Sequence, residues 1–133
     1  MKRAKIFTRL IKELAVLDNT LTRERHVNRI ENEIRLFVHS HGGDVFSGLS
    51  GMDHISLCRT PVHVIVDGIA ASAATFLVVK AVKRSIMPHS RMLIHQISGG
   101  VFGKFDDLHD TYKNYSSTME EIKNVYKNFK III

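Results

Sequence analysis

The chain has few of the residues that build covalent cross-links and no stretch long enough for a membrane span. Its 133 residues include a single cysteine, Cys58, which excludes an internal disulfide and is typical of a reducing compartment. No run reaches the ~20 apolar residues that a membrane-spanning helix needs. The basic amino end is interrupted by charged residues and does not resemble a signal peptide. We therefore expect a cytoplasmic protein that does not act at a membrane.

Basic charge is in excess, with 19 Lys and Arg against 13 Asp and Glu and a formal net charge of +6. Much of it lies near the amino end, where apolar residues recur at helical spacing. This pattern predicts an amphipathic helix with a solvated basic face. A role in nucleic-acid binding is the alternative explanation. We do not expect one, because no nucleic-acid-binding motif accompanies the charge.

With 44% hydrophobic residues, the chain can bury the core of one small domain, which we place at residues 1–133. A helical segment is expected over residues 1–33, with a break at Asp18–Thr20 that caps a second helix. Alternating strands and helices after it favour βαβ units and an α/β fold. The expected elements are strands at 34–38, 62–66, 84–87 and 92–94, and helices at 45–58, 72–80 and 108–130.

The most informative motif is the run Gly68–Ala73, in which Ser72 stands between alanines directly before an apolar stretch. This arrangement is typical of a hydroxyl held at a strand-to-helix turn, where serine can act as a nucleophile. Such a serine needs a base, a group that orients the base, and donors for an oxyanion. His95 is a candidate base. Paired glycines after the strand at 34–38, at Gly42 and Gly43, can turn backbone N–H groups toward a ligand.

Three blocks carry a resemblance to a known family: Ser40–Gly43, Gly68–Ser72 and Pro88–Gln96. In their order and spacing they resemble the signature blocks of the Clp protease proteolytic subunit, ClpP. The resemblance covers roughly residues 31–130 and includes the glycine-bearing segment at 99–103. It implies a ClpP/crotonase-like α/β fold and the activity of an ATP-dependent serine endopeptidase. The Ser40–Gly43 variant also resembles Clp subunits of tailed bacteriophages, which suggests a phage-borne member.

The resemblance assigns roles to individual residues. Ser72 resembles the nucleophile and His95 the general base, while Gly43 and Ala73 resemble the donors of the oxyanion hole. Peptide substrate would lie between two backbone segments, which tolerates many sequences. These segments comprise Gly42, Gly43 and Asp44 on one side and Ile97, Ser98 and Gly99, within the strand 97–101, on the other. The resemblance implies no metal and no cofactor.

The chain departs from the family pattern at three places. His41 and Ile97 stand where the family usually has proline, and no residue matches the aspartate that completes the family's triad. We therefore expect a chain truncated at its C-terminus. Loss of the corresponding aspartate lowers kcat by about 10⁴ in a well-studied triad. The acidic residues Asp67, Asp106, Asp107 and Asp110 are more simply explained as structural, the last three at a helix N-terminus.

Several alternatives remain open at this stage. The chain could be a non-catalytic assembly subunit or fragment, a crotonase-fold acyl-CoA enzyme, or a Ser-Lys peptidase using Lys80 or Lys83. A metal site at His39 and His41, with His54 or His63, lacks any supporting ligand motif.

The resemblance also implies partners: unfolded polypeptide substrates, an AAA+ unfoldase and homo-oligomeric rings. The helix at 108–130 corresponds to the handle through which the family's rings stack. It carries one apolar stripe, made of Leu108, Tyr112, Tyr115, Met119, Ile122, Tyr126 and Phe129. Such a stripe could serve self-association or pack on the chain's own sheet.

Overall fold

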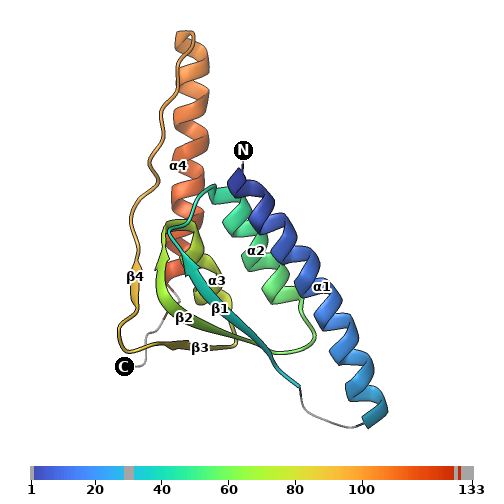
Figure 1. Ribbon diagram of the computed structural model, residues 1–133. Coiled ribbons are helices and arrows are strands. Elements are labelled where there is room, and N and C mark those ends of the chain that lie inside the picture. The colour runs from blue at the N-terminus through green and yellow to red at the C-terminus, as the bar shows by residue number, and fades with distance from the viewer. Residues whose placement is uncertain (1, 29–31, 128, 130–133) are drawn as a thin grey trace. The chain divides into compact units, whose positions relative to one another are not determined.

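The structure is a computed structural model that describes residues 2–28, 32–127 and 129. The chain divides into two compact units, residues 1–94 and 95–133, and each is described by itself (Figure 1). Strand and helix alternate through the first unit, as the α/β prediction requires. Its elements are α1 (Lys2–Asn28), β1 (Ile34–Ser40), α2 (Val45–Leu57), β2 (Val62–Ala71), η1 (Ser72–Ala74), α3 (Thr75–Lys80), β3 (Lys83–Ile86) and β4 (Arg91–Leu93).

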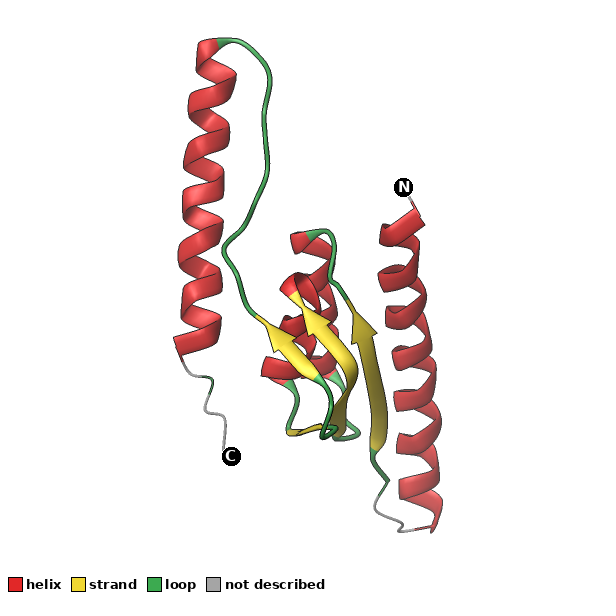
Figure 2. Cartoon of the chain, turned by 60° about the vertical axis from the view of Figure 1, so that its left-hand side comes forward, coloured by secondary structure: helices red, strands yellow, loops and turns green. Residues whose placement is uncertain are grey.

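All strands of the sheet are parallel and pair through β2, which lies at its centre (Figure 2). β1 pairs along one edge of β2 from Ile34 onward. Along the other edge, β3 pairs with residues 63–66 of β2 and β4 pairs with residues 69–71. The strand β2 therefore carries the register of the whole sheet and leads directly to Ser72.

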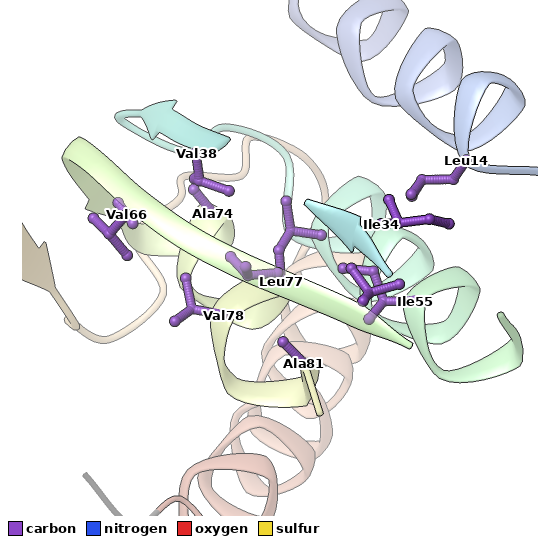
Figure 3. Close-up of a cluster of buried hydrophobic side chains, with 12 residues drawn as sticks. Leu14, Ile34, Val38, Ile55, Val66, Ala74, Leu77, Val78 and Ala81 are labelled. Carbon is purple, nitrogen blue, oxygen red and sulfur yellow. The ribbon is translucent and has the colours of Figure 1, made fainter. Parts of the chain in front are cut away.

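The core lies on the face of β2 to which Val62, Val64 and Val66 project, and each of these is at most 1% exposed. Alternate residues of a strand point to one face, so these three β-branched side chains form a continuous apolar row. Ile55 from α2 and Leu77 from α3 belong to the same buried cluster (Figure 3). Burial of each such side chain contributes about 1.5–3 kcal/mol relative to its exposure.

The predicted break in the N-terminal helix is wrong, because α1 continues without interruption through Asp18–Thr20. Asp18 is buried and its Oδ1 accepts a hydrogen bond of 2.7 Å from the N–H of Thr60. The guanidinium of Arg59 donates to Asn19 Oδ1 at 2.8 Å. These polar side chains hold α1 to the loop before β2 instead of capping a second helix.

Strand β2 is longer than predicted, since it passes through Gly68 and ends at Ala71. Gly68 adopts φ +100°, and a Cβ there would lie 2.1 Å from the His39 ring. The glycine therefore allows the ring to pack against the strand while pairing with β1 and β4 continues beyond it. The predicted helix at 72–80 is divided into the 3-10 turn η1 and the α-helix α3, which begins at Thr75. The strands predicted at 34–38, 84–87 and 92–94 and the helix predicted at 45–58 are confirmed within one or two residues at each end.

The second unit consists of an irregular segment at 95–104 and the helix α4 (Phe105–Lys127). The expectation of a strand over residues 97–101 is wrong for the described part of the chain, in which no strand pairs with this segment. Its contacts are instead with α4: the Ile97 N–H donates to Met119 Sδ at 3.4 Å, and Gly99 lies against Tyr115. The predicted long helix is confirmed, although it begins and ends about three residues earlier. Among the described residues, no helix has both the length and the apolar content to cross a membrane.

Candidate active site

Ser72 occupies the sharp turn between β2 and the helices that follow. It has φ +54° and, among the described residues, is the only non-glycine with positive φ. A backbone of this kind costs roughly 1–3 kcal/mol and persists only where its surroundings impose it. A similar strand-turn-helix geometry exposes the nucleophilic serine of α/β-hydrolases at the end of a sheet. The side chain of Ser72 is half-buried.

A hydrogen bond from the side chain of Thr75 stabilises this turn. Its Oγ1 donates a hydrogen bond of 2.6 Å to the carbonyl oxygen of Ser72, and the residue is fully buried. The sequence prediction missed Thr75. A threonine three residues after the candidate serine was the available signal, because its hydroxyl can bond back to the carbonyl that begins the turn.

Gly42 lies directly against the turn at Ser72. It has φ +89°, and a Cβ there would come within 2.5 Å of the Ala71 oxygen and 2.8 Å of Ser72 Cβ. The same Cβ would lie 3.0 Å from the nitrogen of Ala73. Ala73 is the second residue of η1, where N–H groups lack partners within the helix. The structure thus brings Gly42, Ser72 and Ala73 together. Gly43 is the residue that follows Gly42 in the sequence.

Asp44 has a structural function that the sequence prediction did not anticipate. Its Oδ2 accepts a hydrogen bond of 2.7 Å from the N–H of Ser47 and caps the N-terminus of α2. The carboxylate is therefore engaged with the helix. The backbone carbonyl oxygen of Asp44 also accepts a hydrogen bond of 3.2 Å, from the N–H of Gly48.

The chain returns from β3 to the vicinity of the turn through Ser90. Ser90 is buried, and its Oγ accepts a hydrogen bond of 2.6 Å from the N–H of Gly68. From there β4 runs parallel to the end of β2, with Leu93 opposite Ala71. Leu93 is thus aligned with the residue before Ser72, and His95 follows it by two positions in the sequence.

His95 begins the second unit and is exposed. Its Nδ1 lies 2.7 Å from the carbonyl oxygen of Gln96. Because a carbonyl can only accept, Nδ1 carries the proton and Nε2 is left as an acceptor. A general base at a serine needs this tautomer. Ser98 and Gly99 are exposed, and Ile97 is half-buried with its N–H on the weak sulfur acceptor of Met119.

Other histidines were also candidates for a metal site. Within the described residues, no three His, Cys, Asp or Glu side chains are placed to hold a metal ion. His39 Nδ1 lies 2.8 Å from the Asp67 carbonyl oxygen, and its ring meets that of His41 edge-on at 6.4 Å. Burial and the charge of Asp18 raise the pKa of the Cys58 thiol, which disfavours the nucleophilic thiolate.

Comparison with known proteins identifies the family. The profile of the Clp protease family matches residues 4–130, nearly the whole chain. This chain belongs to the Clp protease family. The ATP-dependent Clp protease proteolytic subunit of Bacteroides fragilis is 35% identical over 95 residues, which cover 70% of this chain and 46% of the relative.

Two further similarities extend the Clp protease assignment. The ATP-dependent Clp protease proteolytic subunit 2 of a Synechococcus species is 32% identical over 117 residues, 77% of this chain and 59% of the relative. This chain therefore spans about half the length of these relatives. A solved structure of a ClpP1 mutant from Listeria monocytogenes matches 92% of this chain and 64% of its own, with a TM-score of 0.76 at 23% identity. The predicted ClpP-like α/β fold is thereby confirmed.

Proposed function

We propose that this Clp protease chain is the proteolytic subunit of an ATP-dependent serine endopeptidase, with Ser72 as its nucleophile. The observation that supports this most is the positive φ of Ser72, directly after β2. Thr75 donates a hydrogen bond to the carbonyl oxygen of Ser72, and Gly42 lies against Ser72. Strain of this kind is concentrated where function requires it. The α/β fold and the family membership supply the context in which such a serine is a nucleophile.

In the proposed reaction, Ser72 Oγ attacks the carbonyl carbon of a peptide bond while His95 Nε2 takes the hydroxyl proton. The N–H groups of Gly43 and Ala73 bind the oxyanion of the tetrahedral intermediate. His95 then gives the proton to the leaving amine, and water hydrolyses the acyl-Ser72 ester by the same steps.

The substrate would lie extended between the backbone of Gly42–Asp44 and that of Ile97–Gly99. The absence of a partner strand along 97–101 in the described part of the chain fits this proposal, because the segment's backbone groups are then available to a peptide. The Ile97 N–H would exchange the sulfur of Met119 for a substrate carbonyl, which is the stronger acceptor.

One observation favours the alternative of a non-catalytic assembly subunit. Nδ1 of His95 donates to the neutral carbonyl of Gln96. A neutral carbonyl fixes the tautomer but stabilises the imidazolium less than a carboxylate does. A base held in this way would be weaker than that of a complete triad.

The names of the relatives, ATP-dependent proteolytic subunits, support two further parts of the proposal. Unfolded polypeptides would be delivered by an AAA+ unfoldase, and the chain would assemble into homo-oligomeric rings. On α4, Leu108, Tyr112 and Tyr115 are 38%, 71% and 42% exposed, which leaves much of the apolar stripe open to contacts between subunits. Multi-angle light scattering of the purified chain tests assembly directly.

The proposed catalysis is tested by labelling the 133-residue chain with a fluorophosphonate probe and mapping the labelled peptide. Trypsin releases residues 60–80, in which Ser72 is the only serine. Labelling of this peptide is expected, and Ser72→Ala abolishes it. His95→Ala is expected to slow it at least tenfold, since general bases contribute about 10²–10⁴. His89→Ala, at an exposed histidine before β4, is the matched control.

Circular dichroism establishes that each variant is folded. An unlabelled Ser72 in a folded wild-type chain would overturn catalysis by this chain and favour the assembly subunit. Equal labelling in the wild type and in His95→Ala would remove His95 from the mechanism and leave Ser72 as a reactive serine.

A further inference from the structure

An arrangement of serine, histidine and carboxylate lies on the face of the sheet opposite the valine row. Strand register aligns Arg35, His63 and Lys83 across β1, β2 and β3. Ser85 follows Lys83 by two residues and so projects to the same face. Glu33 stands just before β1. These residues come from three adjacent strands and the approach to one of them, and none belongs to the site at Ser72.

The contacts within this group form a chain. His63 Nε2 lies 2.9 Å from Ser85 Oγ, and His63 Nδ1 lies 3.9 Å from Glu33 Oε1. Glu33 Oε2 is 3.9 Å from Lys83 Nζ. His63 is only 9% exposed, whereas Ser85 is exposed to solvent. The imidazole is therefore enclosed by protein, and the hydroxyl it contacts is accessible.

The tautomer of His63 follows from its surroundings. Nδ1 is buried and has no hydrogen-bond partner among the described residues, and the nearest ionic acceptor is the Glu33 carboxylate. A proton on Nδ1 faces that carboxylate, so Nε2 is left to accept from the Ser85 hydroxyl. The separation of 3.9 Å is long for a hydrogen bond. In structures without substrate, catalytic hydrogen bonds are often long or poorly aligned, and they shorten when the substrate binds.

Glu33 is held in its ionised form. The hydrogen bond from Arg35 Nε, at 2.8 Å, lowers the pKa of Glu33, and Lys83 and His63 contribute in the same direction. Lys83 also places a positive charge on the same face as Ser85. An ammonium in this position can stabilise an oxyanion that forms on a group attacked by Ser85.

We propose that Ser85 is a second nucleophile, activated by His63 as general base with Glu33 as its positioning residue, and that it reacts with small activated acyl esters. The Ser85 oxygen attacks the ester carbonyl and its proton passes to His63 Nε2. The bond to the leaving alcohol or phenol breaks, and His63 returns the proton to that group. Water then hydrolyses the acyl-Ser85 ester, which regenerates the serine and releases the acid.

This site is remote from Ser72. His63 is the second residue of β2, and Ser72 follows its last residue. At about 3.3 Å per residue, the two lie roughly 25–30 Å apart along the strand. Reaction at Ser85 therefore does not depend on the proposed peptidase, and the two can be scored separately.

The experiment uses a fluorophosphonate and p-nitrophenyl acetate as probes, on the folded 133-residue chain carrying Ser72→Ala. Trypsin releases Ser85 within residues 85–91, and fragment ions distinguish it from Ser90. Labelling at Ser85 is expected to exceed that at Ser56 at least tenfold. Ser56 is the matched control because it is also exposed, but its Oγ donates only to the Met52 carbonyl.

Variants of the supporting residues separate catalysis from structure. His63→Gln can still hydrogen-bond Ser85 but cannot take its proton, and labelling is expected to fall at least tenfold. Glu33→Gln is expected to slow labelling of Ser85 several-fold in a folded chain, since the imidazolium that forms loses its carboxylate, and Glu33→Asp, which keeps the carboxylate, is expected to recover part of this loss. A merely structural Glu33 would change stability in both variants and leave the rate of labelling unchanged. Labelling of Ser85 no faster than Ser56, or unaffected by His63→Gln in a folded chain, would overturn the proposal.

Discussion

Thr75 and Ser72 are joined by a hydrogen bond of 2.6 Å from the threonine hydroxyl to the serine carbonyl oxygen. Thr75 is fully buried, so a side chain in the protein interior stabilises the turn that carries the candidate nucleophile. The conformation of Ser72 is therefore maintained by a side chain that has no part in the proposed chemistry.

Thr75→Val is expected to destabilise the chain by about 1 kcal/mol, because the shape is conserved while the hydrogen bond from the buried threonine hydroxyl to the Ser72 carbonyl oxygen is lost. Urea unfolding followed by circular dichroism measures the change. Thr20→Val is the control. Its hydroxyl makes a similar bond to the Val16 carbonyl on the exposed side of α1, so a change within about 0.5 kcal/mol is expected. Equal losses in the two variants would contradict this account of the turn.

Gly42→Ala is expected to distort the turn and slow fluorophosphonate labelling of Ser72. Gly42 has φ +89°, and a Cβ added there would lie 2.5 Å from the carbonyl oxygen of Ala71. This oxygen belongs to the backbone and cannot rotate away. The left-handed conformation alone costs roughly 1–2 kcal/mol for a residue with a Cβ. Gly100→Ala, where no atom lies within 4 Å of the added carbon, is expected to change neither stability nor labelling. Full labelling and stability in Gly42→Ala would be incompatible with the observed contact.

Asp18→Asn is expected to lower the stability of the first unit at neutral pH by about 1 kcal/mol. Burial of Asp18 opposes its ionisation, but the Thr60 N–H and Arg59 outweigh it and lower its pKa. A carboxylate with a lowered pKa stabilises the fold above its unfolded value, about 3.9, and loses this contribution as the pH falls below it. The difference between wild type and variant should therefore shrink below about pH 4. A difference that stays constant from pH 7 to pH 3 would exclude a contribution from the charge, and Asp53→Asn on the exposed side of α2 controls for net charge.

Leu14→Ala is expected to cost about 2–5 kcal/mol, as for other buried leucines. Leu14 is 3% exposed and belongs to the core cluster with Ile34 and Ile55 (Figure 3). Leu17 is 47% exposed on the same helix, so Leu17→Ala should change stability by less than about 0.5 kcal/mol. Thermal or urea unfolding of both variants decides whether α1 is part of the folding unit. Similar small effects in the two would show that α1 contributes little to the core.

The elements that sequence analysis predicted well are those whose apolar pattern is local. Strand β1, helix α2 and helix α4 each have a hydrophobic pattern of their own. The motif blocks identified Gly42, Ser72 and His95 as candidate site residues. The turn at Ser72 was also expected, because small residues directly before an apolar run favour it.

The errors have a common cause, which is partners that are distant in sequence. Asp18 resembles a helix cap until Thr60 is known to donate to it. Gly68 resembles the end of a strand until the ring of His39 and the pairing of β4 are known. Ser90 was missed for the same reason, since its partner Gly68 is 22 residues away. Such contacts depend on tertiary structure, which local patterns do not determine. Thr75 is the exception, because its partner Ser72 is close in sequence and the spacing was an available signal.

The two short strands β3 and β4 share one edge of β2, and this division has a consequence for the dynamics of the chain. An opening of β4 frees the amide and carbonyl groups that face it at the Ser72 end of β2, while β3 still protects the same edge at the other end. The amide hydrogens of β2 should therefore exchange with solvent in two groups of different rate, those at residues 69–71 faster than those at 63–66. A single strand would then combine a stable half that belongs to the core with a half that can open locally where a substrate would arrive.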